Sequence, residues 1–420
     1  MIFLKKSLVF ILVGGILIRL ILSAVTFHAD IVHFDLAGYV LGKGNILNFY
    51  DYTFNVDKSD QLLKTYQKEL FNYPPAVYLF LGSVNRFLTG FEDKTFHNSF
   101  LFNVKDTLGS PNLFLHLFIL KLPYLIFDLA IAFLLYAFFN TQREKNLAFT
   151  LWMFNPWAIY STFLMGQFDV IPTFFVLLSL YFVLKSKRDL FKKSIISAVI
   201  LGVGASFKIY PLLLLIPLVA TLTIWRQRLV AVLIGVLTYV VTILPFIASA
   251  GFRSTALVAN QTLKSFYSQI PVSGGESIIL FLLGIIFFYL IFLSRNSKIE
   301  NLWQRFFIIL LLFFIFTHYH LQWFLWLTPF LIIELVKTNS KHLFVVILMF
   351  VAFLGNLSLF ESSLSIGLFS PLNPSLSQIP DIWKMLGKNF DLNFLRSLFQ
   401  TVFVGCAFFF IYTYFPIKEE

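Results

Sequence analysis

A short segment near the start of the chain combines side chains that could act as a base or bind a metal. It reads His28-Ala29-Asp30-Ile31-Val32-His33-Phe34-Asp35, with two carboxylates and two imidazoles within eight residues. A carboxylate can remove a proton from a reacting hydroxyl as a general base. Imidazole and carboxylate groups are also metal ligands. The segment therefore predicts either a catalytic acid, Asp30 or Asp35, or a divalent metal site formed by His28, Asp30, His33 and Asp35.

Further polar groups recur later in the chain, each beside a long apolar run. In chain order they are Asn72-Tyr73, Gly166-Gln167-Phe168-Asp169, Lys208-Ile209-Tyr210 and His318-Tyr319-His320-Leu321-Gln322. Structural roles could also explain some of these residues. Asp169 could simply favour a helix N-terminus, and Lys208 could extend toward lipid headgroups. Lys121 and Asp128 lie two turns apart on one apolar run and predict a buried structural pair.

The elements that must position these groups are indicated by composition. Of the 420 residues, 58% are hydrophobic and only 13% are charged, against roughly 25% charged in soluble domains. This excludes a soluble enzyme, a nucleic-acid binder and a disordered scaffold. The net charge of +11 then indicates basic loops at the cytoplasmic face of a membrane. The single cysteine, Cys406, excludes an internal disulfide.

The apolar runs predict an all-α polytopic protein with about twelve transmembrane helices in one membrane domain, 1–420. A bilayer needs about 20 apolar residues per helix. The first predicted span, 8–27, follows Lys5 and Lys6. Spans two to eleven occupy 116–357 and the last is 397–415. The intermediate runs are 116–138, 147–163, 170–184, 194–207, 211–225, 229–248, 277–294, 306–317, 321–336 and 342–357.

The charges between the spans predict their orientation. If the first span runs outward, five short basic connections fall on the cytoplasmic side, as the positive-inside rule requires. Both termini are then cytoplasmic, and the polar clusters lie together at the external face. Two long external loops result, 28–115 and 358–396. The first carries the acids and, at 74–90, a short helix expected at the membrane interface. The second is a lid or a linker.

The order of the motifs resembles the GT-C superfamily of membrane glycosyltransferases. It is closest to the mannosyltransferases of glycosyltransferase family 87 and of the first GPI mannosyltransferase. The shared features are an Asp-bearing segment after the first span, Tyr73-Pro74-Pro75, Phe127-Asp128-Leu129, Asn155-Pro156, Gly166-Gln167-x-Asp169 and Phe207-Lys208-Ile209-Tyr210-Pro211. The resemblance covers about 8–225, with a weaker echo near His318.

The resemblance implies an enzyme that uses a polyprenyl-phosphate sugar, with mannose as the expected sugar, on the non-cytoplasmic side. It implies that Asp30 or Asp35 is the base. The Asp-x-Asp pair of the GPI enzyme is incomplete here, because Val32 stands at its second position. That leaves open both the need for a divalent metal and the choice between the two acids.

General chemistry assigns roles to the other groups. A cation must hold the leaving phosphate, and Lys208 suits this role, with Arg19 as a helper. His318 and His320 could bind phosphate or relay protons. Direct displacement by the acceptor predicts inversion. The expected substrate-binding residues are Tyr73, Gln167, Asp169, Tyr210 and Gln322.

Two other functions remain open at this stage. One is a polysaccharide polymerase or ligase that uses lipid-linked donors, and the other is a transporter or flippase for a lipid-linked sugar. Transporters place their polar site near the bilayer midplane and are commonly built from paired repeats, which this sequence does not show. The expected partners are the polyprenyl-phosphate donor, a lipid or glycan acceptor and membrane lipids, without nucleic acid. The expected location is the cell membrane, or the endoplasmic reticulum in a eukaryote.

Overall fold

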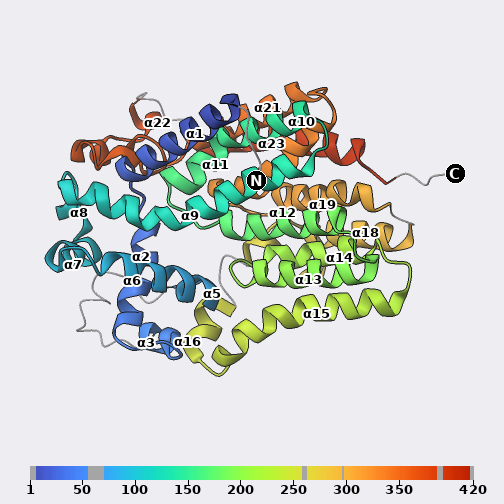
Figure 1. Cartoon of the computed structure of the whole chain (residues 1–420), viewed down its shortest axis with the longest axis horizontal. Helices are drawn as coiled ribbons and strands as arrows, with labels where there is room; N and C mark the ends of the chain where they lie inside the picture. The colour runs from blue at the N-terminus through green and yellow to red at the C-terminus, as the bar shows by residue number, and fades with distance from the viewer. Residues whose placement is uncertain (1–5, 55–70, 258–262, 296–297, 386–390, 417–420) are drawn as a thin grey trace.

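A computed structural model describes residues 6–54, 71–257, 263–295, 298–385 and 391–416 (Figure 1). Long helices run roughly side by side along the longest axis of the molecule, and many short helices gather at one end of them. Within the described residues, five helical stretches are long and apolar enough to cross a membrane. They are α1 (Lys6–Val25), α9 (Pro111–Phe138), α15 continued by η4 (Trp225–Phe246), η7 continued by α19 (Ile299–Phe316) and α23 (Leu392–Thr413).

Shorter apolar helices complete the bundle. They are α12 (Val170–Lys185), η3 with α14 (Tyr210–Val219), α18 (Leu280–Ser294) and α21 (Leu343–Ser358). Helical segments also occupy the remaining predicted spans: α10 (Gln142–Met153), α11 (Pro156–Ile159), η2 (Tyr160–Leu164), α13 (Leu190–Ala205), η8 (Leu321–Trp326) and α20 (Thr328–Lys337). The predicted all-α polytopic membrane fold is confirmed. The number of membrane crossings stays a prediction.

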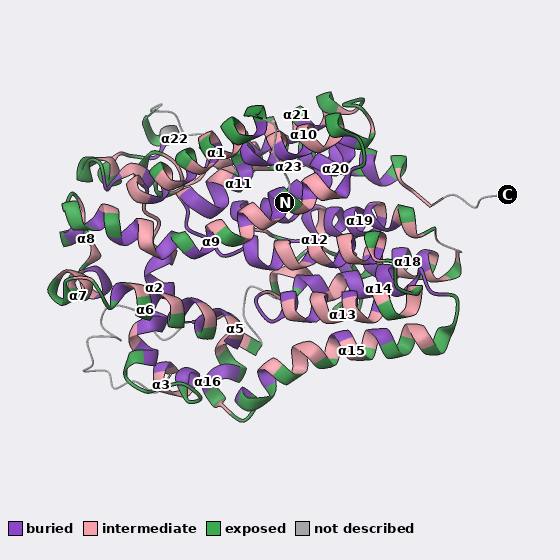
Figure 2. Cartoon of the chain, in the orientation of Figure 1, coloured by how far each residue is buried: buried purple, intermediate pink, exposed green. Residues whose placement is uncertain are grey.

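The bundle has a dry interior and an apolar outer surface. Figure 2 shows α19 and α20 largely buried, whereas much of α15 is exposed or half-buried. Leu229, Leu233, Leu237 and Val241 form an exposed stripe along α15 at the spacing of one helix face. Soluble monomers rarely expose contiguous apolar surface of this extent. These outward faces therefore suit contact with lipid chains.

Small residues bring the helices α13 and α15 close together. A Cβ added to Gly202 on α13 would lie 2.5 Å from the carbonyl oxygen of Gly235 on α15. Such close approach of backbones is typical of helix packing in membranes, where dispersion contacts replace the hydrophobic effect. On the other side α13 packs against α12, and α12 packs against α9. The row from α9 to α15 is thus a continuous layer.

Two buried cations fix α1 against α9 and α10, with partners that differ from those expected. Arg19 Nε lies 2.6 Å from Asp128 Oδ2, and Arg19 Nη1 donates to the carbonyl of Met153 at 2.6 Å. Lys121 Nζ donates to the carbonyls of Thr26 at 2.6 Å and Phe163 at 2.9 Å. The expected pairing of Lys121 with Asp128 is therefore wrong. Both residues lie on α9, but Asp128 bonds Arg19 of α1, and Lys121 bonds carbonyls after α1 and in η2.

The first long loop folds into short helices at one end of the bundle (Figure 1). They are α2 (Asp30–Gly42), α3 (Phe49–Phe54), α5 (Pro75–Val77), η1 (Tyr78–Gly82), α6 (Ser83–Thr89), α7 (Lys94–Phe102) and α8 (Val104–Thr107). The helix predicted at 74–90 is observed as α5, η1 and α6. It packs tightly on α2, because a Cβ on Gly38 would lie 2.9 Å from the Gly82 carbonyl oxygen. Its position at a membrane interface remains a prediction.

The second long loop is attached to the first loop and the bundle. It contains η9 (Ser362–Leu364), η10 (Ile366–Phe369), η11 (Pro374–Gln378) and α22 (Ile382–Met385). The N–H of Phe27 donates to the carbonyl of Leu368 at 2.7 Å, and the Tyr160 hydroxyl donates to the carbonyl of Leu364 at 2.8 Å. These bonds make the segment a wall rather than a free linker.

A third connection, after α15, carries small elements. These are α16 (Ala250–Phe252), η5 (Arg253–Leu257), η6 (Lys264–Phe266) and the strands β1 (Gln269–Ser273) and β2 (Glu276–Ile279). The two strands form an exposed antiparallel hairpin with Gln269 opposite Ile279. They form the one sheet in the part of the chain that the structure describes.

The basic connections meet at the end opposite the short helices. Lys185 Nζ donates to Asn140 Oδ1 at 3.1 Å, and an Arg228 guanidinium nitrogen donates to the Leu293 carbonyl at 3.2 Å. These contacts join connections that are far apart in sequence. One end of the molecule thus carries the basic connections, together with Glu334 and His342, and the other carries Asp30, Asp35 and the other histidines.

This polarity gives a testable orientation. Cysteines replacing the exposed residues Lys105 and Arg188, one at a time in a Cys406→Ser background, are expected to react differently with a membrane-impermeant maleimide in intact cells. The residue-105 cysteine should be labelled and the residue-188 cysteine should react only after lysis, because basic loops stay cytoplasmic. The opposite pattern would reverse the topology.

Candidate active site

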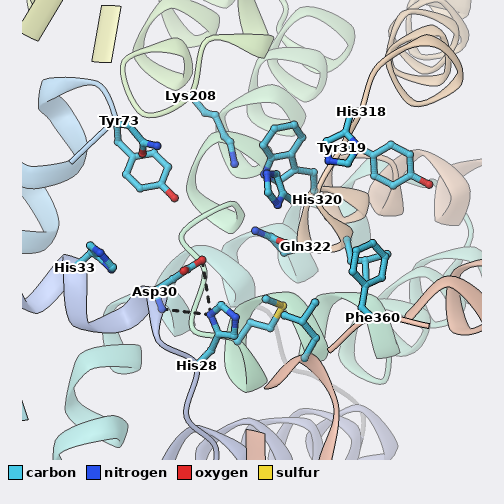
Figure 3. Close-up of a pocket in the computed structure, with 15 residues that line it drawn as sticks. His28, Asp30, His33, Tyr73, Lys208, His318, Tyr319, His320, Gln322 and Phe360 are labelled. Carbon is cyan, nitrogen blue, oxygen red and sulfur yellow. Dashed lines mark hydrogen bonds and ion pairs between the residues drawn. The ribbon is translucent and has the colours of Figure 1, made fainter. Parts of the chain in front are cut away.

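A cavity of 360 Å³ collects side chains from separate regions of the sequence, and four of them supply its polar groups (Figure 3). The regions are the start of α2, the segment before α5, the turn before η3 and the segment from 318 to 323. The second long loop closes one side with Phe360 and Leu364. Among the expected site residues the lining includes His28, Asp30, His33, Tyr73, Lys208, His318, His320 and Gln322. We call this space the active-site cavity.

Asp30 is the first residue of α2, and its side chain points toward the cavity (Figure 3). The amide of Gln167 donates to Asp30 Oδ2 at 2.7 Å, so one carboxylate oxygen is fixed. Gln167 is itself buried, and it follows Gly166, whose φ of +70° favours glycine. A Cβ at Gly166 would lie 2.9 Å from the Ile31 side chain. Gly166 and Gln167 therefore pack against the start of α2 and hold the Asp30 carboxylate in place.

His28 sits beside Asp30 as a neutral ring. Its Nδ1 accepts the backbone N–H of Asp30 at 3.3 Å, which leaves the ring proton on Nε2. Burial lowers the pKa of His28, although the nearby Asp30 carboxylate opposes this shift. Burial also lowers the pKa of His33. Neither imidazole therefore brings a positive charge to the cavity near pH 7, and Asp30 has no cation paired with it there.

Lys208 is the cation of the cavity. Its Nζ lies 2.7 Å from Asp169 Oδ1, and the indole N–H of Trp326 donates to the same oxygen at 2.7 Å. The ammonium also lies 4.6 Å from the ring centre of Trp323, a distance at which cation–π attraction operates. Burial lowers the pKa of Lys208, and the Asp169 carboxylate opposes that shift. The ammonium is therefore held in place by a buried carboxylate and aromatic faces, with N–H groups left for a ligand.

The histidines of the 318–320 segment contribute polar but uncharged groups. Burial lowers the pKa of His320 to about 4, and it lowers the pKa of His318 as well. Within the described chain, His320 Nε2 is buried without a hydrogen-bond partner. An orphaned buried nitrogen of this kind is costly. It is explained if a bound substrate supplies the partner.

Asp35 lies apart from Asp30, although the two acids share α2. It is fully buried and accepts a hydrogen bond from His97 Nε2 at 2.7 Å. His116 Nε2 lies 3.5 Å from the same oxygen, and His116 Nδ1 bonds Glu92 at 2.6 Å. Burial raises the pKa of Asp35, but the two histidines lower it by more, so the carboxylate stays ionised. This cluster joins α2 to α7 and α9 and does not line the active-site cavity.

Four other expected residues also lie outside the lining of the active-site cavity. Gln167 is buried and bonds Asp30, as described above. Arg19 is held by Asp128, as described above. Asp169 stands behind Lys208. Tyr210 stacks on Trp326 with ring centres 3.9 Å apart. The expected four-residue metal site is not assembled, because Asp35 bonds His97 instead of facing His28 and His33. In the described residues no three His, Cys, Asp or Glu side chains are grouped to hold a metal ion.

A second, smaller space adjoins Lys208. It has a volume of 140 Å³ and shares Asn72, Tyr73, Lys208 and Trp323 with the active-site cavity. Its other walls are mostly apolar or aromatic: Pro74, Ile209, Tyr210, Tyr239, Ala256, Leu257, Ser265, Phe313 and Trp326. We call this the aromatic cavity. Lys208 thus stands where a polar space meets an apolar one.

The sequence did not predict a role for Trp326, whose indole N–H donates a hydrogen bond to Asp169. Trp323 and Trp326 are three residues apart in η8, a 3-10 helix, where residues i and i+3 lie one above the other. Their rings stack with centres 5.2 Å apart. The spacing is visible in the sequence, but it predicts a shared face only once the 3-10 geometry is known. Phe360 had no sequence signal, because it reaches the cavity through the fold of the second long loop.

Comparison with known proteins supports the resemblance. The sequence model of glycosyltransferase family 87 matches residues 111–317, which run from α9 through α19. A curated relative is the GPI transamidase component GAB1 of Saccharomyces cerevisiae, with 29% identity over 110 residues. That match covers 25% of this chain and 26% of the relative, so the chain spans about a quarter of that protein's length. The family match, which covers residues 111–317, and the apolar helical bundle are together consistent with a membrane glycosyltransferase of the GT-C type.

Proposed function

We propose that this protein transfers a sugar, with mannose as the first candidate, from a polyprenyl-phosphate donor to a hydroxyl of a glycan or lipid acceptor. The reaction takes place at the non-cytoplasmic face. The observation that carries the proposal is that Asp30 and Lys208, one a carboxylate without a lysine or arginine partner among the described residues and the other a fixed ammonium, line the same cavity (Figure 3). A base and a phosphate-binding cation are the two groups that such a transfer requires.

The proposed reaction is a single displacement. The acceptor oxygen forms a bond to the anomeric carbon while the bond from that carbon to the phosphate oxygen breaks. The acceptor's proton passes to the Asp30 carboxylate, and polyprenyl phosphate leaves with its negative charge beside Lys208. One attack from the face opposite the leaving group inverts the anomeric configuration. Gln167 keeps Asp30 oriented throughout.

The aromatic cavity supports a lipid-linked donor over a soluble nucleotide sugar. With the phosphate at Lys208, the sugar enters the active-site cavity and the first isoprenoid carbons enter the aromatic cavity on the other side of the same ammonium. Tyr73 and Trp323 border both spaces. A nucleotide would require donors and acceptors for its base in that position, whereas the lining there is mostly apolar.

The direct test is turnover of a defined donor. Purified protein in nanodiscs is incubated with radiolabelled polyprenyl-phosphate mannose and a membrane extract, with the glucose-bearing donor as a parallel sample. We expect the label to move from the donor to a new product of inverted configuration, with mannose preferred. In a parallel sample with the protein in sealed vesicles, a donor that moves from one leaflet to the other without chemical change would instead indicate a flippase. No transfer of either sugar would contradict the proposal.

A further inference from the structure

Asp30 also borders a second cavity, whose lining does not include Lys208 and combines serine hydroxyls with apolar side chains. This cavity has a volume of 630 Å³ and shares only His28 and Asp30 with the active-site cavity. Its other walls come from α8 and the turn after it, and from residues 361–378 of the second long loop. The volume is within the range of about 300–1,000 Å³ that small-molecule sites occupy. We call it the serine-lined cavity.

The lining of this cavity suits a neutral, hydroxyl-rich ligand. Three hydroxyls face it, from Ser363, Ser370 and Ser377, together with the Gln378 amide. The lining carries two carboxylates, Asp30 and Glu361, and one ammonium, Lys105, so its net charge is negative. Serine hydroxyls and an amide both donate and accept hydrogen bonds, as sugar hydroxyls do. A phosphorylated ligand would require an excess of positive charge, which this lining lacks.

The walls of the serine-lined cavity are held together by specific contacts. Phe27 N–H bonds the Leu368 carbonyl at 2.7 Å, and Ser362 N–H bonds Asp381 Oδ1 at 2.9 Å. Pro374 packs against Gly109, where a Cβ would lie 3.1 Å from the proline ring. Gly109 has a φ of +83°, so glycine is favoured there on both counts. The second long loop therefore forms a fixed wall against the turn after α8.

We propose that the serine-lined cavity binds the acceptor, a neutral glycan whose reacting hydroxyl is presented to Asp30. This inference rests on the proposed function, because it takes Asp30 as the base. The spaces then follow the reaction in order: the lipid in the aromatic cavity, the phosphate at Lys208, the donor sugar in the active-site cavity, and the acceptor beyond Asp30. The acceptor hydroxyl then approaches the anomeric carbon from the side opposite the phosphate, as displacement with inversion demands.

A plugging variant tests the assignment. Ser363→Trp should fill part of the serine-lined cavity and raise the acceptor KM by about tenfold or more, a loss of about 1.4 kcal/mol in binding. The donor KM and the slow hydrolysis of donor by water should change little. Leu372→Trp is the matched control, because Leu372 is exposed in the same loop and does not line the cavity. Equal acceptor KM values for the two variants would overturn the inference.

A binding measurement separates this inference from the proposed function. Ser377→Cys in a Cys406→Ser background is labelled with a maleimide, with and without the neutral trisaccharide mannotriose. At twice its dissociation constant the sugar should slow labelling about threefold by occupancy, whereas inorganic phosphate should not. Protection without any donor turnover would contradict the transferase mechanism and leave the cavity as a saccharide site. If the protein turns over the donor, the sugar gives no protection and Ser363→Trp has a wild-type acceptor KM, then the acceptor binds elsewhere. That result would refute this inference and leave the proposed function standing.

Discussion

Asp30→Asn is expected to reduce kcat by about 100-fold or more, because general base catalysis contributes roughly 10²–10⁴ in rate. The substitution keeps the shape of the side chain, and the Asn oxygen can still accept the hydrogen bond that Gln167 now gives to Asp30 Oδ2. The amide cannot take the acceptor's proton. Donor KM should therefore stay close to the wild-type value, since the phosphate is bound by Lys208.

Asp35→Asn is the matched control for this prediction. It lies on the same helix and undergoes the same chemical change, but it faces His97 and His116 instead of the active-site cavity. We expect kcat to fall by less than in Asp30→Asn, and thermal stability to fall, because the ionised carboxylate that both histidines bond is lost. Measurements of kcat and of the unfolding temperature for both variants separate these roles. If Asp30→Asn kept near-normal turnover and Asp35→Asn had none, then Asp35 would be the base and Asp30 would not.

The helix phase explains why the sequence left these two acids unresolved. They are five residues apart, which at 3.6 residues per turn places them about 140° apart around the helix axis. One acid must then face away from the cavity, but the sequence does not say which. The answer depends on α7 and α9, whose histidines surround Asp35. Those contacts arise from tertiary packing between segments that are 62 and 81 residues further along the chain.

Much of the fold and half of the site were nevertheless predictable from the sequence. Long apolar runs become helices in a bilayer because a helix satisfies its backbone hydrogen bonds within one segment. The polar groups at the ends of those runs, among them Asp30, Lys208 and His320, do meet in one cavity. Arg19 was not predictable in the same way. It occupies the middle of an apolar run, and its partner Asp128 depends on the register between α1 and α9.

Lys208→Ala is expected to raise the donor KM by about 10- to 100-fold, since a hydrogen bond to a charged group contributes about 1.5–3 kcal/mol. The effect on kcat should be smaller than that of Asp30→Asn. This variant has a second consequence, however. It leaves the fully buried Asp169 carboxylate with only the Trp326 indole N–H as a partner, and such an unpaired charge destabilises the fold. A loss of activity in Lys208→Ala alone would therefore not distinguish phosphate binding from structural support.

The double variant Lys208→Ala/Asp169→Asn makes that distinction. It removes both charges, so the buried carboxylate no longer lacks its cation, while the Asn oxygen can still accept the Trp326 N–H. If Lys208 holds the donor phosphate, the double variant regains thermal stability but keeps the raised donor KM. Lys208→Arg, which retains the cation, should fall between the double variant and the wild type, because the planar guanidinium has a different geometry from the ammonium. If the double variant regains both stability and a wild-type donor KM, then Lys208 serves only to neutralise Asp169, and the phosphate must be bound elsewhere in the cavity.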